Sequence, residues 1–134
     1  MIATPAPVRA SALLATAEAI LDGALRISGG LQARAAALLA RQALEHALAE
    51  FWERRAPDVQ RCRVRTQIQC LSAWLDPEPV AAAATAWNRL SETCHHHPYA
   101  VAPSTAELRA WIASVRTFCE TVLPQRDLEF DSHA

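Results

Sequence analysis

Residues 31–55 read LQARAAALLARQALEHALAEFWERR, a stretch without glycine or proline that lies between Gly30 and Pro57. Its apolar residues recur at helical spacing, which predicts one helix over the whole stretch. One face carries Ala37, Leu44, Leu48 and Phe51. A second face carries only small side chains, namely Ala33, Ala36, Ala40, Ala43 and Ala47. Because alanine is small, this second face would let a neighbouring helix come close.

The remaining chain shows the same periodicity, interrupted by glycine and proline, and predicts four more helices. The first stops at the Ser28-Gly29-Gly30 signal, and the last begins with a capping box formed by Ser104 and Glu107. The first of these helices is expected over Val8–Ile27 and the last over Ser104–Leu123. Between them, a third helix is capped by Asp58 and carries the stripe Val64, Ile68, Leu71 and Leu75. A fourth helix runs from the Asp76–Pro79 turn to His97.

The composition fits one domain built from these helices. The chain has 134 residues, 51% of them hydrophobic, and the pattern contains no strand, internal repeat or glycine-rich phosphate loop. We therefore expect an all-α fold, a single-domain antiparallel bundle of four to five helices over residues 1–134. Residues 1–7 and 125–134 are expected to be frayed tails.

Charge and cysteine content limit the possible partners and location. The formal net charge is −1, which provides no global attraction to nucleic acid or to an anionic membrane. No apolar run has the length of a secretory signal or of a membrane span, so a cytoplasmic protein is expected. Without any CxxC spacing, free and mostly buried thiols are expected at Cys62, Cys70, Cys94 and Cys119.

Residues 86–99, AWNRLSETCHHHPY, place three histidines at the end of the fourth expected helix. At 100° per residue the three side chains point in different directions, which argues against a metal ion held by this cluster alone. Only Cys94 with His97, or ligands from another helix, could converge. We expect no metal or cofactor, and we expect His97 to pack at the helix end with Trp87, Leu90 and Cys94.

Arg89 and His96 are seven residues apart and would share a face of this helix. An imidazole near neutral pKa can move the proton of an RNA 2′-hydroxyl, and a guanidinium can stabilise the charge on the phosphate. His95 is the alternative histidine. Asn88 and Glu92 lie nearby, and Glu92 could pair with Arg89. Tyr99 either covers the cleft or fills the helix seam.

The run from Arg89 to His96, RLSETCHH, resembles the R-x(4-6)-H signature of HEPN domains, and RAAALLARQALEHAL looks like the long helix that precedes it in that family. The resemblance implies a homodimeric helical bundle in which Arg and His of both protomers face one cleft. Many members are metal-independent endoribonucleases, often toxin or defence effectors with an antitoxin or accessory partner. Active members commonly have a polar residue after the arginine, whereas this chain has Leu90. A catalytically silent module for dimerisation, partner binding or nucleotide binding therefore stays open.

A second basic segment contains Arg61, Arg63 and Arg65, preceded by Arg54 and Arg55. It could follow a phosphate backbone, or it could be a solvated helix face. The four tryptophans, Trp52, Trp74, Trp87 and Trp111, are expected in the core or at a dimer interface, because base stacking would require their exposure.

Overall fold

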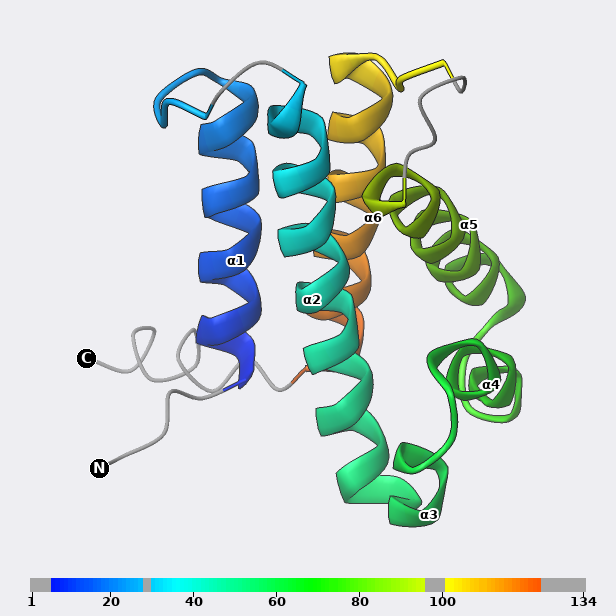
Figure 1. Ribbon diagram of the computed structural model, residues 1–134. Helices are drawn as coiled ribbons and strands as arrows, with labels where there is room; N and C mark the ends of the chain where they lie inside the picture. The colour runs from blue at the N-terminus through cyan, green and yellow to red at the C-terminus, as the bar shows by residue number, and fades with distance from the viewer. Residues whose placement is uncertain (1–5, 28–29, 96–100, 124–134) are drawn as a thin grey trace, which may run out of the picture.

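The computed structural model describes residues 6–27, 30–95 and 101–123. Within these residues it contains six α-helices and a short 3-10 turn, with no strand (Figure 1). The all-helical class is therefore confirmed. The elements are α1 (Ala6–Leu21), α2 (Leu31–Arg55), α3 (Pro57–Gln60), α4 (Val64–Cys70), the turn η1 (Leu71–Ala73), α5 (Pro77–Cys94) and α6 (Thr105–Val122).

The long helix α2 is the centre of the bundle and contacts α1, α5 and α6, as well as α3 and α4. Figure 1 shows that α1 and α5 run in one direction and α2 and α6 in the other, with α5 tilted across the bundle. Of the five alanines of the small face, Ala36, Ala40, Ala43 and Ala47 are fully buried, and Ala33 is half-buried. Larger side chains complete the core, among them Leu14, Leu44, Leu48, Phe51, Trp52, Leu90, Ile112 and Phe118.

The first helix corrects the expected boundaries at both ends. It begins at Ala6 rather than Val8, and it ends at Leu21 rather than Ile27. Gly23 has φ +80. Its N–H donates to the carbonyl of Ile20 at 3.1 Å, and the N–H of Ala24 donates to the carbonyl of Ala19 at 3.0 Å. These two bonds form a Schellman motif, whose left-handed residue favours glycine. The stop signal is thus Gly23, well before Gly29 and Gly30.

The prediction of one continuous third helix is also wrong, because this segment divides into α3, α4 and η1. Asp58 lies inside the first turn of α3 and does not cap it, since the N-cap position is occupied by Ala56. The break is held by Gln67, whose amide Nε2 donates to the carbonyls of Gln60 at 3.2 Å and Cys62 at 2.8 Å. A side-chain amide thus satisfies carbonyls that a continuous helix would have bonded itself.

The start of α6 agrees with the sequence prediction, whereas the end of α5 does not. The side chain of Ser104 accepts from the N–H of Glu107, whose carboxylate accepts from the N–H of Ser104, both at 3.1 Å. This confirms the capping box. In contrast, α5 ends at Cys94 instead of His97. The expectations for His96, His97 and Tyr99 fall outside the described residues.

Within those residues, no helix combines the length and the apolar character needed to cross a bilayer.

Candidate functional site

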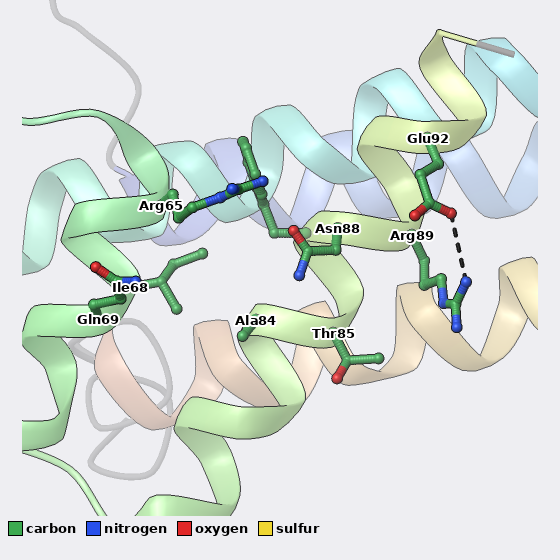
Figure 2. Close-up of a pocket in the computed structure, with 9 residues that line it drawn as sticks. Arg65, Ile68, Gln69, Ala84, Thr85, Asn88, Arg89 and Glu92 are labelled. Carbon is green, nitrogen blue, oxygen red and sulfur yellow. Dashed lines mark hydrogen bonds and ion pairs between the residues drawn. The ribbon is translucent and has the colours of Figure 1, made fainter.

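An open groove of about 630 Å³ lies between α4 and α5 (Figure 2). Its walls come from two segments that are separate in the sequence and that pack side by side in the fold. The groove is lined by Arg65, Ile68 and Gln69 on α4, and by Ala84, Thr85, Trp87, Asn88, Arg89 and Glu92 on α5. Most of these side chains are polar, and two of them are arginines.

Arg89 lies on the outer face of α5, because the next residue, Leu90, faces the core and is fully buried. Its side chain is 57% exposed, and its Nη1 lies 3.5 Å from a carboxylate oxygen of Glu92. An exposed pair of this kind stabilises a protein by only about 0–1 kcal/mol. The guanidinium can therefore exchange the Glu92 carboxylate for another anion at little cost.

Arg65 approaches the same groove from α4. Its guanidinium carbon lies 6.0 Å from the centroid of the Trp87 ring, a cation–π distance that holds the side chain over α5. In Figure 2 the Arg65 side chain extends from α4 toward Asn88. The structure therefore brings together Arg65, Asn88 and Arg89, which the sequence had assigned to two separate candidate sites.

Other candidate residues lie apart from this groove. Arg61 and Arg63 are exposed on the loop before α4 and are not among the described residues that line it. His95 is exposed at the C-cap of α5, where its backbone N–H donates to the carbonyl of Ser91 at 3.1 Å. His95 is six positions after Arg89, so at 100° per residue their directions differ by about 120°. The Arg89–His95 pair therefore does not share one face of the helix.

Arg89 and Glu92 also border a second, smaller hollow of about 290 Å³. Its opposite wall is formed by residues before and within α6, including Pro103, Glu107 and Trp111. Arg89 consequently lies on a ridge between two concave surfaces. Its side chain therefore borders both the α4–α5 groove and the hollow beside α6.

The four cysteines are free, as expected, but only Cys119 is buried; Cys70 and Cys94 are half-buried and Cys62 is exposed, so the expectation of mostly buried thiols is wrong. Burial raises the pKa of the Cys94 thiol, although Arg41 and Arg34 act in the opposite direction. Burial also raises the pKa of Cys119 to about 12. These two thiols therefore remain protonated near neutral pH and are poor nucleophiles. Among the described residues, no three His, Cys, Asp or Glu side chains gather where they could hold one metal ion.

Two further groove residues had no expected role: Gln69 is one of the glutamines interleaved with the arginines of residues 54–65, and Thr85 was not singled out from the sequence. A signal was present, because Gln69 follows Arg65 by four residues and Thr85 precedes Arg89 by four. Side chains four apart lie on the same face of a helix. Without knowledge that α4 packs against α5, however, these two faces could not be joined into one site.

Comparisons with protein-family models, with curated proteins and with solved structures find no match for this chain. Any functional conclusion therefore rests on the chemistry of the groove itself.

Proposed function

We propose that this protein is a HEPN-like helical module that binds the phosphate backbone of RNA in the groove between α4 and α5. The observation that supports this proposal is the presence of Arg65 and Arg89, from different helices, in one open groove. Guanidinium groups suit phosphate because their planar donors can bind two oxygens at once. Asn88 and Gln69 add uncharged donors at the same site.

A polymeric ligand is favoured over a single phosphate by the charge beyond the groove. Between residues 50 and 65 the chain has five arginines and three carboxylates, so this segment is basic although the whole chain is not. Binding would then be local and strongly dependent on salt. An RNA ligand also agrees with the expected cytoplasmic location.

The binding test compares alanine variants of Arg65 and Arg89 with a matched control, Arg26→Ala, which removes an exposed arginine outside the groove. Affinity for a fluorescent oligouridylate is measured by anisotropy at several salt concentrations. Each groove variant should lose affinity by about ten-fold. Each should also reduce the slope of log K against log salt by about 1. Wild-type affinity in both groove variants would exclude this binding site.

Glu92→Gln provides a test with the opposite sign. It removes the carboxylate that pairs with Arg89 and leaves an amide of nearly the same shape. If phosphate competes with Glu92 for the guanidinium, this variant should bind RNA more tightly than wild type. Weaker binding would show that Glu92 supports the site in another way.

Endoribonuclease activity is a second candidate function. One observation favours it: Arg89 is exposed little more than one turn before the end of α5, and the histidine run follows directly. Because Arg89 and His95 lie on different faces, a catalytic pair would use His96 or a histidine from a second copy of the chain. The homodimer and an antitoxin or accessory protein implied by the HEPN resemblance belong to this candidate.

This candidate predicts RNA cleavage that persists in EDTA and is lost in Arg89→Ala and in His96→Ala or His95→Ala. Cleavage that continues in all three variants would refute the assignment. RNA binding without cleavage would instead identify the catalytically silent module. The buried position of Leu90 favours this silent form, because the residue after the arginine does not reach the groove.

A further inference from the structure

Trp74 differs from the other tryptophans in its exposure. All four lie in the described residues, and Trp74 is 53% exposed while Trp52 is buried and Trp87 and Trp111 are half-buried. An indole has the largest apolar side-chain surface, so exposing it to water is unfavourable. A tryptophan held on the surface is therefore a candidate for contact with a ligand.

A backbone hydrogen bond and a ring contact fix the position of this indole. The backbone N–H of Trp74 donates to the carbonyl of Leu71 at 2.9 Å, which fixes the residue at the end of η1. Its ring meets Phe51 edge-to-face, with centroids 6.5 Å apart and an angle of 88°. Phe51 belongs to the core and is itself buried. Trp74 thus rests against a rigid support and stays open to solvent.

A positive charge lies beside this ring. The guanidinium carbon of Arg55 is 4.3 Å from the Phe51 centroid and 5.8 Å from the Trp74 centroid. The last turn of α2 also contains Arg54, which pairs with Glu50 at 2.7 Å. An aromatic surface next to cationic side chains suits a nucleotide, which has both a π-face and a phosphate.

This surface is close to the groove. Gln69 lines the groove, and Trp74 follows it by five residues, so their Cα atoms are at most about 18 Å apart. Figure 1 shows the end of α2, α3 and α4 together at one end of the molecule. One extended RNA strand could therefore contact both the α4–α5 groove and the Trp74 side chain.

We infer that Trp74 and Arg55 form a stacking platform for an unpaired base of the same RNA strand whose phosphates lie in the α4–α5 groove. This inference rests on the proposed function and makes its ligand single-stranded RNA. In a duplex the bases are stacked on one another and cannot reach an indole, whereas an unpaired base can. Stacking also tolerates any base, so the platform would add affinity with little sequence preference.

The test compares Trp74→Leu with Trp74→Phe. Leucine keeps apolar bulk against Phe51 but has no π-face, and phenylalanine keeps an aromatic face; Leu25→Ala is a control for an exposed apolar residue elsewhere. The probes are an oligouridylate of about 12 nucleotides and the matching abasic ribose-phosphate oligomer. Trp74→Leu should weaken binding of the oligouridylate by about ten-fold and leave the abasic oligomer unchanged. Trp74→Phe should retain most of the affinity.

The variants separate failure of this inference from failure of the proposed function. If Arg65→Ala and Arg89→Ala lose RNA binding while Trp74→Leu binds normally, the groove stands and the platform is wrong. Equal loss of both oligomers in Trp74→Leu would also overturn the platform, because the base would not be involved. If Trp74→Leu changes only the molar mass measured by light scattering, the indole serves a protein contact and the inference fails.

Discussion

Replacing Gln67 with glutamate would test how the turn between α3 and α4 is held. Gln67 is only 7% exposed, and its amide donates to the carbonyls of Gln60 and Cys62. Glutamate has the same shape, but its ionised carboxylate has no donor. The variant would therefore place a negative charge against two carbonyl oxygens that have lost their hydrogen bonds.

The expected cost follows from these two contacts. Each hydrogen bond contributes about 0.5–1.5 kcal/mol, so their loss alone costs about 1–3 kcal/mol. Unfavourable contact with the carboxylate raises the total to about 2–4 kcal/mol at pH 7. For a domain of this size, that loss lowers Tm by roughly 10 °C.

The cost should also depend on pH, because a protonated glutamate regains one donor. Burial against the carbonyls raises the pKa of the introduced carboxyl in the folded state above its value in the unfolded chain. Such a group contributes stability below the unfolded pKa of about 4.3 and loses it as pH rises through the folded pKa. The gap between the variant and wild type should therefore narrow as the pH falls from 7 toward 4.

Urea unfolding followed by circular dichroism at pH 7 and pH 4.5 measures both effects. Gln69→Glu is the matched control, since it adds the same charge at an exposed position of the same helix. Gln67→Met, which removes the donors without adding charge, should be intermediate. The interpretation is wrong if Gln67→Glu and Gln69→Glu have the same free energy of unfolding at pH 7.

Three further predictions concern local features of the fold. Ser104→Ala removes the capping box of α6 and should cost about 1 kcal/mol in thermal unfolding, whereas an unchanged Tm would show that the cap does not stabilise the bundle. Gly23→Ala should lower the free energy of unfolding by about 1–2 kcal/mol, because φ is +80 at this position. The matched variant Gly30→Ala, at φ −65, should cost less. Neither new Cβ meets another atom within 4 Å, so equal losses of stability in the two variants would contradict a backbone origin. Burial raises the pKa of Cys119 from 9.0 to about 12, so this thiol ionises at lower pH in the unfolded chain than in the folded one. The free energy of unfolding should therefore fall as pH rises above 9, and Cys119→Ala should remove this part of the decline. A parallel decline in the wild type and the variant would argue against a contribution from Cys119.

The sequence predicted best those features that depend on neighbouring residues. The limits of α2 follow from a helical pattern between Gly30 and Pro57, and the start of α6 follows from Ser104 and Glu107. The early end of α1 is also encoded locally, in Gly23, although the expected stop was at Gly29 and Gly30. The α3–α4 break was harder to predict, because it depends on the side chain of Gln67 bonding backward to carbonyls five and seven residues earlier.

For the candidate site, the sequence identified Arg65 and Arg89 as phosphate contacts but treated them as separate. It also assigned Trp74 to the core or to an interface, together with the other tryptophans. Whether Arg89 acts with His96 stays a prediction, since His96 lies outside the described residues.

The sequence by itself determined an all-helical chain, the extent of its central helix and the cap of its last one, because periodicity and capping act within a few residues. Only the tertiary structure decided that Arg65 shares a groove with Arg89 and that Trp74 faces solvent. Both depend on how α4 and η1 pack against α5 and α2, and the pattern within any one helix does not specify which face its neighbours will cover.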